Sequence, residues 1–414
     1  MKIILKIPLL IFLIILISCQ NLVISDLSSL SLKENKSDVI DVNLKENGET
    51  ISEFINRLYA AGAPDSRQAL VDSFLTSHEN DNFPLIEIEK AWFIYTSENA
   101  QTAKVAGDFN GWSPTLMLSH VGGTNFFFAS QTFENDARLD YKLVIDDNWI
   151  LDPRNTHQVS GGYGPNSECA MLDYVQPSEI QVNTESQGTV SSSYFQDETM
   201  GLTHTYSVYL PPNYSESETY PVAYFLDGNE YIQLGFAANV LDNLIYENKV
   251  QPIIGVFIDP INRNTEYAYD YNYLTMITSE FVPFIDSTYS TQPTAAGRAI
   301  IGVSLGGLTS LLFVEQYPEV FGNCGAFSPA VWLGNIRDVY NSAQNLSGKF
   351  YLDAGTYEES IYNASIDILT RLQAINADYT WKVWHEGHSW GAWRAHLDEA
   401  LIYFWPMSTN SVDK

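Results

Sequence analysis

Seven short apolar runs separated by helical stretches occupy residues 205–405, and this alternation constrains the fold more than any other feature of the sequence. The runs are TYSVYLPP, YPVAYFLDG, PIIGVFID, RAIIGVS, NCGAFSP, KFYLDAG and YTWKVWHEG. Runs that are apolar throughout are typical of parallel strands that helices cover on both faces. The pattern therefore predicts an α/β fold with a doubly wound sheet over residues 205–408. In such sheets the chemistry collects at the carboxyl ends of the strands.

The run RAIIGVS ends in the pentapeptide Gly302-Val303-Ser304-Leu305-Gly306, and a stretch with helical spacing follows it. This G-x-S-x-G pattern is typical of a nucleophile elbow, the strand-to-helix turn that exposes a serine hydroxyl in α/β-hydrolase sheets. A structural turn with an incidental serine is the alternative. A nucleophilic serine needs a histidine that is itself held by a carboxylate, and here the expected order is serine, acid, histidine.

The segment VWHEGHSWGAW follows the last apolar run and carries His385 and His388. We predict that His388 is the catalytic base, because it lies beyond Gly387 in a loop while His385 still belongs to the strand end. The two histidines are one residue too close for the H-E-x-x-H zinc motif. We therefore expect no metal, and no other cofactor.

The segment KFYLDAGTYEES supplies the candidate acids Asp353, Glu358 and Glu359. We favour Glu358, because it enters the loop that would face the histidine, whereas Asp353 is expected inside the strand. Asp353 is the first alternative and Glu359 the second.

An oxyanion that forms on a substrate carbonyl needs two preorganised donors. The backbone N–H of Leu305, directly after the serine, is the predicted first donor. The second is expected from Gly228 or Asn229 in the loop after YPVAYFLDG. A plain turn is the alternative interpretation of that loop.

The chain begins MKIILKIPLLIFLIILISCQ, with two lysines, an apolar run over residues 7–17 and a cysteine at position 19. The run is short for a membrane span and typical of a signal peptide. Its end resembles the bacterial lipobox, which implies that Cys19 is lipidated. We expect a signal peptide at 1–18, a flexible tether at 19–49 and a lipid-anchored protein of the cell envelope, periplasmic or associated with the outer membrane. Ordinary secretion and a retained anchor are the alternatives.

Residues 81–176 show strand-like runs such as KAWFIYTS and RLDYKLVI, separated by turns. They predict a small all-β, immunoglobulin-like sandwich, with a short helical segment at 50–80 before it and a linker at 177–204 after it. The motifs GDFNGWSP, YKLVIDDNWILDP and GGYGPNS resemble a glycogen-binding-type module (CBM48, E-set-like). The resemblance implies carbohydrate contacts by Trp112, Lys142, Trp149 and Asn166. Many such modules instead use their tryptophans for domain packing.

Six motifs resemble, in order, those of the putative esterase family (the esterase D-like group). They are FLDGNEY, IDPINRNTEY, IIGVSLGGLTS, YPEVFGNCGAFSPAVW, LDAGTYEE and EGHSWGAW. The group includes enterochelin, feruloyl and acetyl-xylan esterases and related acyltransferases. The resemblance implies a serine carboxylic ester hydrolase with Ser304, Glu358 and His388 as its triad. It also implies an ion pair between Arg263 and Glu266 at the border of the site.

Charge and aromatic content narrow the choice of substrate. A net charge of −29 excludes nucleic acid as a partner. Residues 205–414 hold 9 Lys/Arg against 23 Asp/Glu, a balance that repels an anionic siderophore. Aromatic rings near the strand ends suit sugars or phenolic acyl groups. We predict substrate contacts by Arg263, Glu266, Tyr267, Trp332 and Trp390.

The leading hypothesis is hydrolysis of an acylated carbohydrate such as feruloyl or acetyl xylan, with membrane contact through the lipid anchor. Two alternatives remain open: an enterochelin-type siderophore esterase, and a catalytically dead carbohydrate-binding lipoprotein. The sequence also leaves open whether water or a second alcohol accepts the acyl group.

Overall fold

The computed structural model describes residues 49–162, 164–267, 269–334, 336, 340, 346 and 348–407. The signal peptide, the lipidated Cys19 and nearly all of the tether lie outside the described residues. Among the described residues, no helix is both long enough and apolar enough to cross a membrane.

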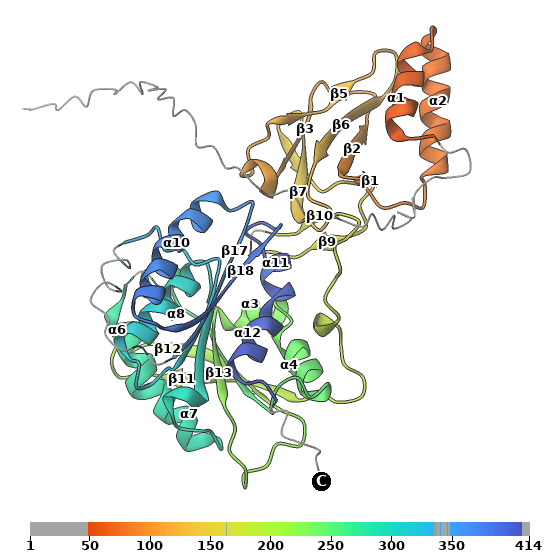
Figure 1. The fold of residues 1–414 in the computed structure, drawn as a ribbon. Helices are drawn as coiled ribbons and strands as arrows, with labels where there is room; N and C mark the ends of the chain where they lie inside the picture. Colours follow the sequence, from red (N-terminus) through yellow and green to blue (C-terminus); the bar gives the residue numbers. More distant parts are fainter. Residues whose placement is uncertain are drawn as a thin grey trace, which may run out of the picture. The chain divides into compact units, whose positions relative to one another are not determined.

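Two helices and two mainly antiparallel sheets form the first part of the described chain (Figure 1). The helices are α1 (Ile51–Ala60) and α2 (Pro64–Ser77), and a 3₁₀ turn, η1, covers Asp108–Asn110. One sheet has the order β1-β2-β6-β5, and the other has the order β4-β3-β7-β10-β9 with β8 added to β7. The strands are β1 (Leu85–Glu87), β2 (Lys90–Thr96), β3 (Ala103–Gly107), β4 (Leu116–Met117), β5 (Ser119–His120), β6 (Phe126–Thr132), β7 (Arg138–Ile145), β8 (Asn148–Ile150), β9 (Gln158–Val159) and β10 (Asn166–Ala170). We call residues 85–170 the two-sheet region.

Strand β7 shows how the two-sheet region divides apolar from polar side chains. Its residues Leu139, Tyr141 and Leu143 are fully buried in a core shared with strands of the other sheet. Successive side chains on a strand point to opposite faces. Arg138 and Asp140 therefore point away from that core, and yet they too are buried. Something other than the region's own core must cover them.

A third sheet, with eight strands, lies in the rest of the described chain, in the order β11-β12-β14-β13-β15-β16-β17-β18. The pairings of β11 with β12 and of β12 with β14 are antiparallel, and the remaining neighbours, from β14 and β13 to β17 and β18, are parallel. The strands are β11 (Thr189–Gln196), β12 (Thr203–Leu210), β13 (Val222–Leu226), β14 (Ile254–Ile258), β15 (Arg298–Val303), β16 (Asn323–Phe327), β17 (Lys349–Gly355) and β18 (Asp378–Trp384). This arrangement confirms the predicted doubly wound α/β fold.

Helices cover both faces of this sheet (Figure 1). The helices and turns are η2 (Ser178–Ile180), α3 (Gly228–Gln233), α4 (Ala237–Tyr246), α5 (Arg263–Glu266), α6 (Tyr271–Met276), the π-helical η3 (Ile277–Phe281), α7 (Val282–Thr288), η4 (Ala295–Gly297), α8 (Leu305–Gln316), α10 (Glu359–Ala374), α11 (Trp390–Ala395) and α12 (Leu397–Phe404). One cluster of buried side chains includes residues of α6, α7, α8 and α10, and another includes residues of α3, α4, α11 and α12.

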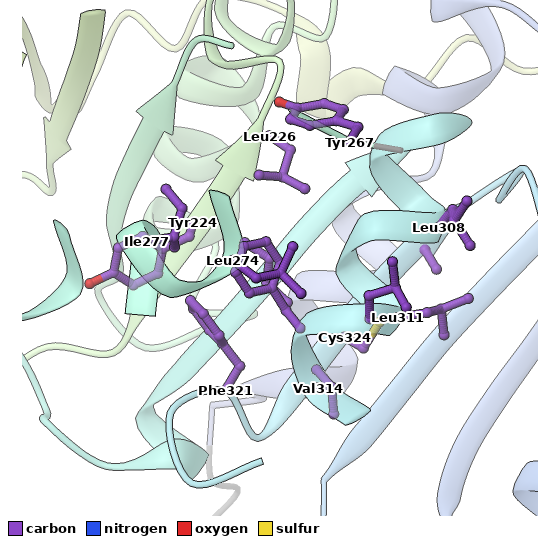
Figure 2. Packing of buried hydrophobic residues seen from close by; sticks show 14 of the residues in the cluster. Tyr224, Leu226, Tyr267, Leu274, Ile277, Leu308, Leu311, Val314, Phe321 and Cys324 are labelled. Atoms are coloured by element: carbon purple, nitrogen blue, oxygen red, sulfur yellow. The ribbon is translucent and has the colours of Figure 1, made fainter. Parts of the chain in front are cut away.

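The continuous apolar character of the strands follows from these two layers. On β13, Tyr224 and Leu226 belong to one cluster while Ala223 and Phe225 belong to the other. Figure 2 shows part of the first cluster, in which Tyr224 and Leu226 of β13 share one core with Leu274 of α6 and with Leu308 and Leu311 of α8. A strand in this position has no solvent-facing side, so alternation with polar residues disappears.

The expected linker at 177–204 is wrong in its second half. Residues 189–196 form β11, the edge strand of the large sheet, which pairs along its whole length with β12. Nearly all of its side chains are exposed, and the sequence TVSSSYFQ is correspondingly polar. Edge strands commonly carry polar residues because one side has no partner strand, and here that composition resembled a linker.

Candidate active site

Ser304 lies between the end of β15 and the start of α8, on a turn that is strained for a side-chain-bearing residue. Its φ and ψ are 55° and −116°. A Cβ atom at Gly302 would lie 2.4 Å from the backbone of Gly306, so the turn can close only with glycine at this position. Strain of this kind is characteristic of the nucleophile elbow and leaves the hydroxyl outside the helix.

The structure brings Ser304, His388 and Glu358 together from three separate loops. Ser304 Oγ and His388 Nε2 are 2.9 Å apart. The other ring nitrogen of His388, Nδ1, is hydrogen-bonded to Glu358 Oε1. His388 is exposed while Glu358 is buried. A serine, an imidazole and a buried carboxylate joined in this order can transfer the serine proton to the imidazole.

Glu358 is held by a hydrogen-bond network on its far side. Its Oε2 accepts from Ser328 Oγ at 2.8 Å and from the backbone N–H of Gly355 at 2.6 Å. Ser328 Oγ in turn accepts from Trp393 Nε1 at 3.0 Å. The Trp393 ring stands perpendicular to the His388 ring, with centroids 4.8 Å apart. Hydrogen bonds from Ser328 and from the backbone of Gly355 thus fix the Glu358 carboxylate, and Trp393 fixes the Ser328 hydroxyl.

The other two candidate acids do not contact the histidine. Asp353 is buried inside β17, where its Oδ1 accepts the backbone N–H of Ser328 at 2.9 Å. Burial raises the pKa of Asp353 to about 7. Glu359 is exposed at the first position of α10. Of the three carboxylates, Glu358 is the one that meets His388.

Of the three predicted oxyanion donors, Leu305 and Gly228 remain candidates and Asn229 does not. Leu305 is the first residue of α8, and the first N–H groups of a helix have no partner within that helix. The N–H of Asn229 donates to Asp259 Oδ1 at 2.6 Å. That donor is therefore engaged, and the prediction for Asn229 is wrong. Gly228 packs so tightly on β14 that a Cβ atom would lie 2.5 Å from Phe257, and its N–H is the remaining candidate.

The expected ion pair between Arg263 and Glu266 is wrong. Arg263 forms a bidentate pair with Asp227, with distances of 2.7 and 2.8 Å, and also donates to Val303 O at 3.3 Å. Glu266 instead accepts the N–H groups of Ile261 and Asn262 at the start of α5. Asp227, in the FLDG motif, is therefore a residue of the site that the sequence did not indicate.

Three of the five predicted substrate contacts are buried in the protein. Tyr267 lies in the core, where its hydroxyl accepts the N–H of Asp227. Trp390 packs edge-on against Tyr231, and Glu266 is enclosed by its own loop. Side chains with so little accessible surface offer a ligand almost nothing to contact, so these three predictions are wrong. Trp332 is 44 % exposed and Arg263 is partly exposed.

Of the four predicted carbohydrate contacts, two form hydrogen bonds within the protein and two lie on a common face of the sheet. Trp112 Nε1 donates to Asp108 Oδ1 at 3.1 Å, and Asn166 Nδ2 donates to Asp140 Oδ2 at 3.0 Å, so both side chains are engaged within the protein. Trp149 is 48 % exposed on β8 opposite Val144 of β7. Lys142, two residues from Val144 on β7, lies on the same face as Trp149.

Within the described ranges, no group of three or more His, Cys, Asp or Glu side chains converges in the way that a metal site requires.

The fold and the family comparison define a carboxylic ester hydrolase. The family model described as "Putative esterase" matches residues 198–404, which is half of the chain. The chain therefore belongs to the putative esterase family, as its motifs indicated.

The chain is similar in sequence to several curated proteins. An uncharacterized protein, YjcH, of Bacillus subtilis (strain 168) is 30% identical over 231 residues, covering 52% of this chain and 96% of its own. An endo-1,4-beta-xylanase/feruloyl esterase of Xylanibacter ruminicola is 27% identical over 208 residues, covering 47% of this chain and 28% of its own. An iron(III) enterobactin esterase of Escherichia coli (strain K12) is 26% identical over 204 residues, covering 46% of this chain and 50% of its own.

Among solved structures, the ferric enterobactin esterase of Salmonella typhimurium superposes with a TM-score of 0.68 at 17% sequence identity. The match covers 76% of this chain and 93% of that chain. A match over 76% of this chain is longer than the half that the family model covers. At this identity the similarity shows that the two chains share a fold.

Proposed function

We propose that this protein is a serine esterase that hydrolyses acylated carbohydrate, such as feruloyl or acetyl xylan, through an acyl-enzyme. The observation that carries the serine mechanism is the 2.9 Å separation of Ser304 Oγ and His388 Nε2, with Glu358 at the other nitrogen of the ring. Ser304 is the nucleophile, His388 the general base and Glu358 the residue that orients the imidazole.

Ser304 Oγ attacks the ester carbonyl while its proton passes to His388 Nε2. The resulting oxyanion accepts hydrogen bonds from the N–H groups of Leu305 and Gly228. Collapse of the tetrahedral intermediate expels the alcohol, which takes the proton from His388. Water then attacks the acyl-enzyme with His388 again as base, and the released carboxylic acid leaves Ser304 free.

Charge near the nucleophile favours a neutral substrate. Arg263 lies beside Ser304, since it donates to Val303 O, and its guanidinium is already paired with Asp227. A paired cation offers little attraction to a strongly anionic iron chelate. The exposed ring of Trp332 follows Ala330, whose N–H donates to Ser304 O, and it suits a sugar or phenolic face.

Hydrolysis of a siderophore lactone is the second candidate within the same mechanism. The iron(III) enterobactin esterase of Escherichia coli is related in sequence over 46% of this chain, a share close to that of the feruloyl esterase relative. The two candidates differ in the charge of the substrate and in the acyl group.

A side-by-side assay tests the proposal. We expect turnover of p-nitrophenyl acetate, and among natural esters a kcat/KM for feruloylated or acetylated xylo-oligosaccharides well above that for a ferric catecholate lactone. Ser304→Ala and His388→Ala should each abolish turnover with little change in Tm. Retention of most activity by either variant would refute the serine mechanism, and a preference for the lactone would establish the second candidate.

We also propose that Cys19 is lipidated and anchors the protein in the cell envelope, on the strength of the sequence around it. In a bacterial host that processes lipoproteins, the full chain should label with a fatty-acid analogue and fractionate with membranes. Cys19→Ser should lose the label. Equal labelling of both chains would contradict the assignment.

A further inference from the structure

The backbone on both sides of His388 is in contact with the two-sheet region. A Cβ atom at Gly387 would lie 2.2 Å from Asp108 Cγ, and one at Gly391 would lie 2.2 Å from Arg138 Cζ. Side chains of the two-sheet region therefore rest directly on the loop that carries His388. Glycine at both positions permits this close approach, because any other residue would place a side-chain atom inside Asp108 or Arg138.

Arg138 also forms hydrogen bonds to this loop. Its backbone N–H donates to His385 O at 3.1 Å, in a short parallel bridge beside Glu386. Its Nη1 donates to Ser389 Oγ at 3.1 Å. The residues three positions before and one position after His388 are thus bonded to the same arginine.

Arg138 is held rigidly enough to act as a support. It is completely buried, and its Nη2 and Nε pair with Asp140 Oδ1 at 2.7 Å and Glu168 Oε2 at 2.8 Å. A buried guanidinium is tolerated only where neighbouring carboxylates balance its charge. The two carboxylates lie on β7 and β10, so neighbouring strands of one sheet fix the guanidinium, and Ser389 of the catalytic loop takes a further N–H.

Asp108 is fixed in the same way. Its Oδ2 accepts the backbone N–H of Asp140 at 2.7 Å, and its Oδ1 accepts from Trp112 Nε1 at 3.1 Å. The carboxyl group is buried, and it lies against Gly387, directly before the histidine. The motif GDFNGW therefore serves to present Asp108 to the catalytic loop.

These contacts reach the imidazole through helix α11. Ser389 Oγ, which accepts from Arg138, also accepts the N–H of Ala392 and so caps α11. That helix carries Trp393, whose ring stands perpendicular to His388. Displacement of Ser389 would move both the chain at His388 and the ring beside it.

We propose that Arg138 and Asp108 are positioning residues for His388, and that the two-sheet region is thereby part of the catalytic apparatus of the esterase. This role rests on the proposed function of His388 as the base. Misplacement of a catalytic group by about 1 Å can cost about 100-fold in rate, so loss of these contacts should lower turnover without removing a reacting group.

Other bonds between the same two parts supply a matched control. Glu134 Oε2 accepts from Tyr357 OH at 2.6 Å at an exposed position. Glu134 touches neither Gly387 nor Ser389 through any bond described above. Glu134→Ala removes a hydrogen bond from the same interface while leaving the supports of His388 in place.

The first test, in the full chain, inserts a methyl group between the loop that carries His388 and the side chain of Asp108. Gly387→Ala requires no left-handed backbone, since Gly387 is outside the positive-φ glycines, and it places its Cβ against Asp108. We expect kcat for p-nitrophenyl acetate to fall by at least about tenfold. Asp108→Ala, which removes the support instead of adding a methyl group, should lower kcat in the same direction.

The second test leaves the buried ion pairs intact. Ser389→Ala removes the acceptor of Arg138 and the cap of α11, and we expect at least about a tenfold loss of kcat. Ser389→Thr retains the hydroxyl and suits the extended backbone at this residue, so it should stay within about threefold of wild type. Glu134→Ala should match wild type, and Tm values would verify that each variant is folded.

Three outcomes would overturn the proposal: wild-type kcat in Asp108→Ala or in both Gly387→Ala and Ser389→Ala, a loss of kcat in Ser389→Thr equal to that in Ser389→Ala, or an equal loss in Glu134→Ala. In each case an inactive Ser304→Ala would leave the proposed function standing. Activity in Ser304→Ala would instead remove the serine mechanism itself.

Discussion

Ser328 and Glu358 are joined by a 2.8 Å hydrogen bond in which the serine hydroxyl donates to Oε2 of the carboxylate. The same hydroxyl accepts from Trp393 Nε1, so one buried oxygen connects the acid to the ring that stands beside His388. The acid and the base are therefore aligned by a single shared neighbour.

Ser328→Ala should weaken both catalysis and stability. Trp393 Nε1 would lose its acceptor in the core, which costs about 1–3 kcal/mol of unfolding free energy. Glu358 would lose one of two supports on Oε2, and we expect about a tenfold fall in kcat, since a hydrogen bond to a charged group contributes about 1.5 kcal/mol. Urea denaturation and p-nitrophenyl acetate kinetics measure the two effects.

Ser365→Ala is the matched control for that variant. Its hydroxyl is buried on α10, and among the described residues it has no hydrogen-bond partner. Removing it should leave kcat unchanged and alter the free energy of unfolding little. A similar loss of kcat in both serine variants would show that Ser328 has no special relation to Glu358.

Replacement of the two neighbouring carboxylates should give opposite results. Glu358→Gln leaves His388 Nδ1 without an anionic partner, and we expect kcat to fall about 10³- to 10⁴-fold, as in other hydrolases with this arrangement. Asp353→Asn should retain most activity, because Asp353 bonds to the backbone of Ser328 and not to His388. The reverse pattern would make Asp353 the acid.

The burial of Asp353 predicts a pH dependence of stability. Burial raises its pKa to about 7. Between about pH 4, where a carboxyl in the unfolded chain ionises, and pH 7 the folded protein binds more protons, so stability falls as the pH rises. One pKa unit corresponds to about 1.4 kcal/mol, so the loss is on the order of 4 kcal/mol. Thermal denaturation from pH 4 to pH 8 should show a flatter profile for Asp353→Asn; parallel profiles would contradict this.

Removing both partners of the Arg263–Asp227 pair should cost less stability than removing the arginine. Asp227 is buried, and Arg263→Met would leave its charge unpaired. The expected loss is below the about 3–5 kcal/mol of a fully buried pair, because Arg263 is partly exposed. Arg263→Met/Asp227→Asn should recover part of it in urea denaturation. Additive losses would mean that the pair is not coupled.

Trp149 is an exposed ring on β8, at a position where the sequence predicts a carbohydrate contact. Trp149→Ala should reduce retention on insoluble xylan severalfold, since a sugar face stacks on an indole ring, and should leave p-nitrophenyl acetate turnover unchanged. A pull-down assay with insoluble xylan measures the first effect. Tyr194→Ala, at a ring that is 74 % exposed on β11, is the control, and equal effects would indicate non-specific adsorption.

Predictions from the sequence succeeded where a short stretch carries the whole signal. The apolar runs reported the parallel strands because each strand is buried on two faces by helices. The elbow at Ser304 could be read from its glycines, since Gly302 and Gly306 must touch for the turn to close. The choice of Glu358 over Asp353 followed from its position beyond the end of β17.

The sequence failed where a residue's role depends on what lies across from it. Tyr267 and Trp390 look like a binding rim, but they are core residues under loops that the chain brings over them. Edge strand β11 resembled a linker, because an exposed strand carries no apolar pattern of its own. Arg138 gave no local sign of its role, since its partner Ser389 is 251 residues away.

The sequence by itself therefore determined the doubly wound sheet and the order serine, acid, histidine, because burial on two faces and the closure of a tight turn are enforced by neighbours in the chain. Only the tertiary structure decided which aromatic rings remain exposed and that side chains of the two-sheet region contact the loop that carries His388. Those contacts join distant segments, and their geometry exists only once the sheets have packed.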